Sequence, residues 1–465
     1  MTISDALTST LQSLGIISIL LMIGAVLRAK IPLFQNLYLP SCVIGGFIGL
    51  ALGPNALDII HFSEDTMAVA SALPNLLIIP VLAATPMGLK LFGQKTKRSD
   101  TLTKSNDVLV ISFLTAGFLI LQLAVGCGVT LVCKALGAET FEGMGLEMGA
   151  GFAGGHGTAA SIGSSFQEFG NPNWEAALGG GMTTATVGVI SGIIIGTILI
   201  NYAAKRGYTT QIKAAAETPV EMRVGLYAKG DARPSMGEQT TVSNSIETLT
   251  LHLGLLLIAS FLSYPLGSLC KMTGISLFSS VPTWLYGMIV MLVLWSAISF
   301  LNLDYLFDDT VKNKVTGLLS DYMITAAIMS ISLSVVLTYW VVLVAMIVAG
   351  LIFVPALNWV ICKKMLRRNW FEKSLGVLGT NLGVYVTGML LIKMADPDLK
   401  SDALSDYSVG YTIGSLAVTP LLAVAIGYAA TSGTSSAFYW CSIASVLIFA
   451  AMFIVHFITR GKRSA

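Results

Sequence analysis

The stretch Glu147-Met-Gly-Ala-Gly-Phe-Ala-Gly-Gly-His-Gly-Thr-Ala-Ala-Ser-Ile-Gly163 decides how this chain folds, because its glycines, histidine and hydroxyls interrupt apolar surroundings. Glycine loses more entropy on ordering than any other residue, so this density is typical of backbone that bends sharply or approaches a ligand closely. Such backbone cannot face lipid, since unpaired amides and carbonyls are tolerated at membrane depth only inside protein or beside a wet cavity. We therefore predict a re-entrant hairpin near residues 145 to 165.

Close helix packing is the alternative explanation, because small residues also let membrane helices approach each other. Packing accounts neither for the consecutive Gly154-Gly155 nor for the polar triplet His156-Gly157-Thr158. It also leaves unexplained the acids that flank the stretch, which are Glu142, Glu147, Glu168 and Glu175. These features favour the hairpin.

The composition is that of a polytopic membrane protein. The chain has 465 residues, of which 54% are hydrophobic and 11% charged, and its mean hydropathy is +0.78. Soluble domains carry about 25% charged residues. We therefore expect the lipid bilayer to be the main surroundings of the chain, and the net charge of +2 gives no reason to expect a nucleic acid partner.

Apolar runs of about 20 residues, the length that crosses the hydrocarbon core, predict an all-α protein. Eleven such spans are expected near 10–28, 39–57, 67–89, 107–133, 179–203, 248–268, 282–302, 317–337, 339–362, 408–430 and 436–458. Two further stretches, 145–165 and 373–392, are too rich in glycine and hydroxyls for ordinary spans, and we predict that both are re-entrant hairpins.

Charge placement predicts the orientation, because short cytoplasmic loops carry the excess of Lys and Arg. If the hairpins turn back and the N-terminus is outside, all of the 27 Lys and Arg except Lys134 and Lys271 face the cytoplasm. The C-terminus is then cytoplasmic, as is a polar linker over 204–247.

The two halves of the chain repeat weakly. Leu39-Pro-Ser-Cys-Val-Ile-Gly-Gly46 opens the second span and Val281-Pro-Thr-Trp-Leu-Tyr-Gly-Met288 opens the seventh. Five crossings in each half, an odd number, predict two inverted five-helix repeats, 1–203 and 248–430, each with one hairpin. The span at 436–458 is then an extra C-terminal transmembrane helix.

Two hairpins that enter from opposite faces of the membrane would bring the ends of their half-helices to the same depth in the bilayer. Half-helix N-termini suit an anion, and unwound carbonyls and hydroxyls suit a small cation. The predicted substrate contacts are Gly154, Gly155, His156, Gly157, Thr158, Ser161, Thr380, Asn381, Gly383 and Thr387. The predicted sodium contacts are Thr158, Asn381, Thr387 and Asp321.

Two of these residues have an alternative interpretation. His156 either contacts substrate or holds the tight turn through a hydrogen bond to backbone. Asp321 is a carboxylate within an apolar run, which favours function, but its place near the end of that run also permits a solvated position.

Enzyme signatures are absent from the sequence, which contains no His-Glu-x-x-His, Gly-x-Ser-x-Gly or phosphate-binding glycine loop. We expect neither enzymatic activity nor a cofactor. With no nucleotide-binding motif, uphill transport would use an ion gradient. A channel or a sensor is the alternative function.

Two motifs resemble the bacterial sodium/glutamate symporters: Leu39-Pro-Ser-Cys-Val-Ile-Gly-Gly46 and above all Gly154-Gly-His-Gly-Thr-Ala-Ala160. The resemblance extends from about residue 15 to 430. It implies symport of glutamate or a similar small carboxylate with sodium across the inner membrane of a bacterial cell, a homodimer, and an elevator-like moving domain. A dicarboxylate or hydroxycarboxylate is the alternative substrate.

The second hairpin departs from that family. Where the family has a segment similar to Phe-Gly-Leu-Gly-Ala-Thr-Pro-Thr-Ala, this chain has Thr380-Asn-Leu-Gly-Val-Tyr-Val-Thr-Gly388. Only Leu382, Gly383 and Thr387 match. The expectation of sodium-coupled transport therefore rests mainly on the first hairpin.

Overall fold

The structure, a computed structural model, describes residues 3–37, 39–88, 101–209, 224–227, 229–230, 233–242, 244–273, 282–396 and 401–461. Within these ranges the chain is helical and contains no strand. The elements are α1 (Ile3–Lys30), α2 (Pro32–Asn36), α3 (Ser41–Leu52), α4 (Glu64–Ala83), α5 (Thr101–Ala135), α6 (Leu146–Phe152), α7 (Gly155–Glu168), α8 (Trp174–Arg206), α10 (Thr248–Met272), α12 (Thr283–Phe300), η1 (Asp304–Leu306), α13 (Asp309–Met329), α14 (Leu333–Thr338), α15 (Trp340–Met365), α16 (Trp370–Leu382), α17 (Tyr385–Ala395) and α18 (Ala403–Gly461).

Eight helices in the described part of the chain are long and apolar enough to cross a membrane. The prediction of an all-α polytopic membrane protein is confirmed at this level. The spans expected at 408–430 and 436–458 both lie in α18, which kinks at Gly433, where φ is 83° and ψ is 176°. Part of the linker expected at 204–247, namely residues 210–223, 228, 231–232 and 243, lies outside the described residues.

Two expected spans differ from the helices observed. The run at 39–57 is helical only over Ser41–Leu52. The run at 317–337 is divided, because α13 ends at Met329 and α14 begins at Leu333. The start of α13 is also earlier than its apolar run, since the Asp308 side chain caps the helix by accepting a hydrogen bond from Val311 N.

The order of elements repeats along the chain. Helices α1, α3 and α4 are followed by α5, the broken pair α6–α7 and α8, and helices α10, α12 and α13 are followed by α15, the broken pair α16–α17 and α18. Pro40 and Pro282, paired by the sequence repeat, are the N-cap residues of α3 and α12. The two glycine-rich stretches are thus both helix pairs with a central break.

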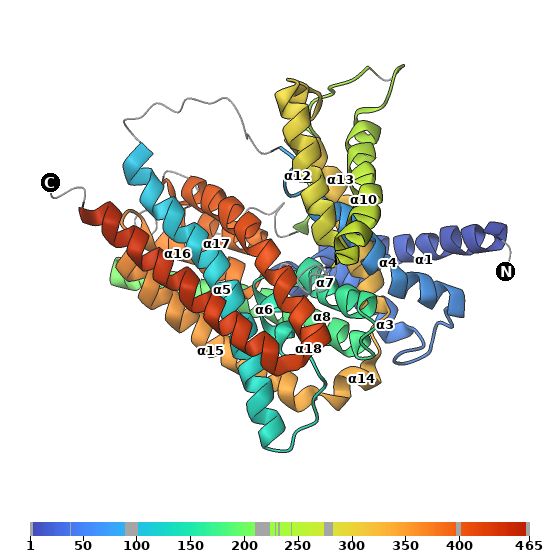
Figure 1. The fold of residues 1–465 in the computed structure, drawn as a ribbon, viewed down its shortest axis with the longest axis horizontal. Coiled ribbons are helices and arrows are strands. Elements are labelled where there is room, and N and C mark those ends of the chain that lie inside the picture. The colour runs from blue at the N-terminus through green and yellow to red at the C-terminus, as the bar shows by residue number, and fades with distance from the viewer. Residues whose placement is uncertain are drawn as a thin grey trace.

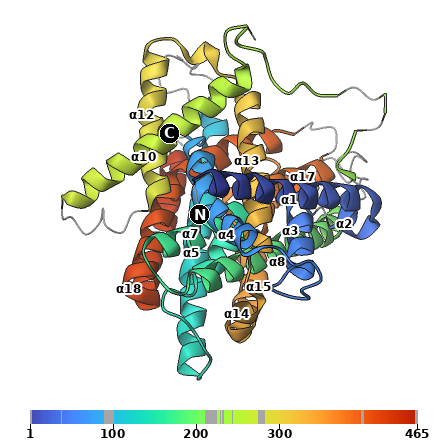
Figure 2. The same ribbon diagram turned by 90° about the vertical axis from the view of Figure 1, so that its right-hand side faces the viewer.

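In space the helices form two bundles (Figures 1 and 2). Helices α1, α3, α4, α10, α12 and α13 pack together as the first bundle, and α5, α8, α15, α16, α17 and α18 form the second. The pair α6–α7 lies where the bundles meet, because α7 contacts α4 and α13 as well as α8. The first broken pair is therefore placed between the two bundles.

Glu168, the last residue of α7, ties this pair to the first bundle. Its carboxylate accepts hydrogen bonds from Thr283 N at 2.9 Å and from Thr283 Oγ1 at 2.6 Å. Lys271 Nζ lies 3.2 Å from the same carboxylate. The carboxylate thus accepts from a backbone N–H in the first turn of α12, which has no partner within the helix. One acidic residue therefore links the first broken pair to the first bundle.

Candidate functional site

The breaks of the two helix pairs touch each other. Gly155, at the first break, has a φ of +68°, and a β-carbon on it would lie 2.2 Å from Val384 Cγ1 at the second break. Only glycine gives this combination of left-handed backbone and close approach without strain. Val384 also lines two cavities. Residues at or next to both breaks therefore line each of the two cavities.

The first of these, which we name the hydroxyl cavity, has a volume of about 320 Å³. Its polar lining consists largely of hydroxyl groups, those of Thr85, Thr115, Thr158, Ser161, Tyr411, Ser415 and Thr419. Several donate their hydrogen to backbone of their own helix: Ser161 to Thr158 O at 2.6 Å and Thr419 to Ser415 O at 2.7 Å. Such hydroxyls keep only oxygen lone pairs for a ligand, and lone pairs suit a cation.

The second, which we name the charged cavity, has a volume of about 330 Å³. Arg28 of α1 and Asp321 of α13 bring opposite charges to it from the first bundle. His156, Gly157 and Thr387 line it from the broken pairs. A cavity with a cationic and an anionic group at its wall can hold a molecule that itself carries both charges.

His156 is buried and pairs with a side chain of α8. Its Nε2 lies 3.0 Å from Thr186 Oγ1, and the Thr186 hydroxyl in turn donates to Met182 O at 3.0 Å. Because that hydroxyl hydrogen is already used, Thr186 Oγ1 accepts and His156 Nε2–H donates. Of the two interpretations of His156, the one with a hydrogen bond to backbone is not observed, because the partner is a side chain. In neutral histidine this tautomer leaves Nδ1 as an acceptor.

The structure brings together some of the predicted contacts and separates others. Gly154, Thr158 and Ser161 line the hydroxyl cavity, whereas His156, Gly157, Thr387 and Asp321 line the charged cavity. Gly155, Thr380, Asn381 and Gly383 line neither. The four predicted sodium contacts are accordingly distributed over three places.

Thr380 and Asn381 are buried behind the second break. Thr380 Oγ1 contacts Tyr407 OH of α18 at 2.5 Å. Asn381 Nδ2 donates to Val377 O at 2.8 Å, and Asn381 O accepts from Gln122 Nε2 at 3.1 Å. Asn381 Oδ1 and Gln122 Oε1 are both buried without a hydrogen-bond partner in the described structure. A buried acceptor without a donor is rare and points to water or an ion.

Lys373 has a position that the sequence did not predict. The charge count places it in a cytoplasmic loop, but it is only 1% exposed and lies in α16. Its Nζ is 2.6 Å from Asp107 Oδ2 of α5 and 2.8 Å from Asp406 Oδ2 of α18. Both carboxylates are buried, so this ion triad fixes the base of the second broken pair against two helices.

Other residues of the site were also absent from the predicted set. Tyr411, Ser415 and Thr419 were counted as part of an apolar span, although their spacing of four residues places one hydroxyl per helical turn on one face. That spacing is a signal that sequence reasoning could have used. Arg28 was assigned to a loop and no local pattern distinguishes it from other loop arginines.

Broken helices that meet beside two polar cavities, inside an apolar helical fold, define the class of multi-pass membrane transporters. The family model for sodium/glutamate symporters matches residues 7–394, and the chain belongs to this family. A search of curated proteins found no match. Family membership supports a sodium-coupled transporter. The matched region ends before α18, and therefore before Tyr407 and Tyr411.

Proposed function

We propose that the protein is a secondary active transporter that moves glutamate, or a similar small carboxylate, together with sodium. The observation that carries the proposal is the contact between Gly155 and Val384, a residue that lines both a cavity with hydroxyl oxygens and a cavity with charged groups. A transporter that couples two solutes needs two adjacent sites of different chemistry. Movement of Val384 would affect both sites at once.

The charged cavity is the proposed substrate site. A guanidinium such as Arg28 binds a carboxylate, and a carboxylate such as Asp321 binds an ammonium. Thr387 Oγ1 and His156 Nδ1 add hydrogen-bonding groups from the broken pairs. An α-amino acid meets both charges, whereas a dicarboxylate leaves Asp321 without a partner. This favours glutamate over the dicarboxylates and hydroxycarboxylates.

Sodium is proposed to bind in the hydroxyl cavity, with Thr158 and Ser161 as ligands beside unwound backbone at Gly154. Asn381 Oδ1 and Gln122 Oε1 mark a second position that suits sodium, because both oxygens are buried and lack donors. Arg28 and His156 line only the charged cavity. Sodium would therefore be separated from the positive charge of Arg28.

The wider architecture is part of the same proposal. We infer that the broken pairs are re-entrant hairpins in inverted repeats, and that the second bundle moves against the first in an elevator-like manner. The sliding surface would then be the one at which α7 contacts the first bundle. The N-terminus outside, a cytoplasmic C-terminus, the bacterial inner membrane and a homodimer complete the proposal.

Uptake by proteoliposomes tests the function directly. We expect labelled glutamate to accumulate against its gradient when sodium is high outside, and not when potassium replaces sodium. Glutarate, the same dicarboxylate without the amino group, is the matched control for substrate class. Glutarate that competes as well as glutamate would contradict the assignment of Asp321. Equilibration without accumulation would indicate a channel and contradict coupled transport.

A further inference from the structure

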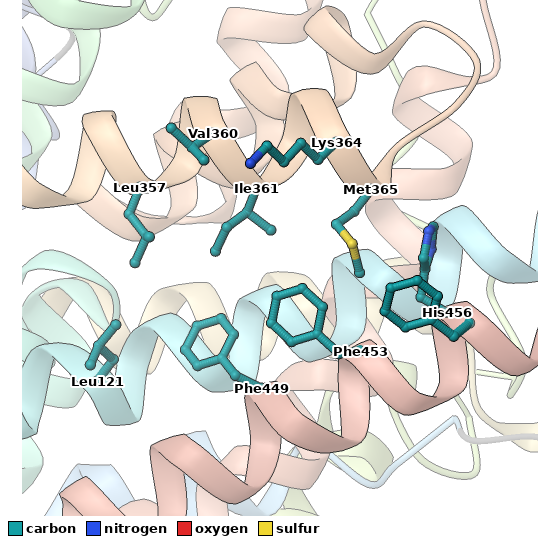
Figure 3. A pocket seen from close by; sticks show the side chains of 10 residues that line it. Leu121, Leu357, Val360, Ile361, Lys364, Met365, Phe449, Phe453 and His456 are labelled. Carbon is teal, nitrogen blue, oxygen red and sulfur yellow. The ribbon is translucent and has the colours of Figure 1, made fainter.

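A third cavity lies away from the two broken-pair sites. It has a volume of about 640 Å³ and is formed between α15 and the C-terminal part of α18, with α5 at its floor (Figure 3). Leu357, Ile361 and Met365 point from α15 toward Phe449 and Phe453 of α18 (Figure 3). Val360 and Phe457 complete its apolar wall. We name this cavity the lateral groove.

The surroundings of the lateral groove are those of a membrane. Both helices that form its long walls are among those long and apolar enough to span a bilayer. Its open side is apolar, since Val360, Phe453 and Phe457 are 48%, 43% and 62% exposed. A volume of about 640 Å³ lies within the roughly 300–1,000 Å³ typical of small-molecule sites. An acyl chain fits such a groove chemically.

One end of the lateral groove is basic. Lys364 and His456 line it at the end where α15 finishes. Lys364 is exposed and forms no ion pair among the described residues, whereas its neighbour Lys363 lies over the Tyr208 ring at 5.1 Å. The sequence there also contains Arg367 and Arg368. A group of basic residues at the end of a membrane span is typical of binding to anionic lipid.

We propose that the lateral groove binds one anionic phospholipid, with an acyl chain along Leu357 and Phe453 and the phosphate at Lys364. The apolar wall and the basic end are complementary to the two parts of this one molecule. The α18 wall, which includes Phe449, Phe453 and His456, lies beyond the residues matched by the family model. The site is independent of the proposed substrate and sodium positions.

The test measures lipid binding to the purified full-length chain in detergent by native mass spectrometry. The probes are dioleoylphosphatidylglycerol, which is anionic, and dioleoylphosphatidylcholine, which is not. We expect one phosphatidylglycerol to stay bound under conditions that remove phosphatidylcholine. Equal retention of the two lipids would overturn the proposal.

Two pairs of variants locate the site. A lysine near a membrane surface contributes about 1 kcal/mol to binding of anionic lipid, so Lys364→Gln should weaken phosphatidylglycerol binding about five-fold. Lys363→Gln, one residue away but facing Tyr208, is the matched control and should have a smaller effect. Leu357→Trp fills the groove and should abolish binding. Ile352→Trp, on the same helix at a side chain that is 67% exposed, should leave binding unchanged.

Other results identify other occupants. Equal effects of Lys364→Gln and Lys363→Gln would show diffuse attraction to the basic end and overturn the assigned phosphate position. If Leu357→Trp changes the oligomeric mass and leaves lipid binding intact, the groove is an interface between copies of the chain. That result would also overturn the proposal. None of these readouts depends on transport activity, so they separate this site from the proposed function.

Discussion

The two broken helix pairs look alike in the sequence but differ in the structure. In α6–α7 the polar residues after the break reach the cavities: Thr158 and Ser161 line the hydroxyl cavity and His156 lines the charged cavity. In α16–α17 the residues before the break, Thr380 and Asn381, are turned into the protein. The first pair therefore supplies three polar side chains to the two cavities, and the second supplies one, that of Thr387.

The difference extends to how each pair is held. The first pair is tied to the first bundle by Glu168 at the end of α7, and Glu168 is partly exposed. The second pair is fixed inside the second bundle by Lys373 between two buried carboxylates. The comparison indicates that the first pair spans the surface between the bundles, while the second belongs to one bundle. The predictions below test that comparison.

The largest expected effect is on stability, at Lys373. Lys373→Met leaves Asp107 and Asp406 buried without their cation, and breaking a buried ion pair in this way costs about 3–5 kcal/mol. We expect a large drop in the melting temperature of the purified protein. Lys134→Met, which breaks an exposed pair with Glu142, should cost about 0–1 kcal/mol. Similar losses for the two variants would show that the triad does not fix the second pair.

Gly155→Ala should abolish transport at every sodium concentration. The added β-carbon meets Val384 Cγ1 at 2.2 Å, and the backbone is left-handed. Left-handed strain and overpacking together cost about 2–5 kcal/mol. Gly170→Ala is the control for backbone strain alone, because Gly170 has a φ of +69° but no atom within 4 Å of the new carbon. Val384→Ala should partly restore transport to Gly155→Ala, and an absence of rescue would contradict the contact between the breaks.

Asn381→Ala should weaken sodium binding and leave the geometry of the second broken pair in place. Loss of a buried hydrogen-bonding group costs about 1–3 kcal/mol, or roughly a 5- to 150-fold rise in the sodium concentration for half-maximal uptake. Asn358→Ala is the matched control, because Asn358 is equally buried but its amide contacts Ser374 O and Cys362 Sγ. Unchanged sodium dependence in Asn381→Ala would make Asn381 a packing residue.

The sequence predicted the helical breaks well because glycine density has a direct backbone cause. Both glycine-rich stretches are helix pairs, and the Pro40 and Pro282 repeat marks equivalent helix starts. The positions of Lys373 and Arg28 could not be predicted in this way. Hydropathy averages over a window, so a lysine near a helix end looks like a loop residue whether it faces water or two carboxylates. Which hydroxyls face a cavity likewise depends on packing between distant helices.

The proposal that sodium and substrate bind in two different cavities beside the breaks is tested most directly by a pair of isosteric variants. Thr158→Val removes a hydroxyl from the hydroxyl cavity, and Thr387→Val removes one from the charged cavity. Valine keeps the side-chain shape, so only an oxygen ligand is lost. The two half-saturation concentrations are measured in proteoliposomes, each at saturating levels of the other solute.

We predict that Thr158→Val raises the half-saturating sodium concentration about ten-fold, the equivalent of roughly 1.4 kcal/mol, and leaves that of glutamate unchanged. Thr387→Val should raise the half-saturating glutamate concentration by a similar factor and leave that of sodium unchanged. Equal shifts of both constants in both variants, or the reverse pattern, would contradict the assignment of the two cavities.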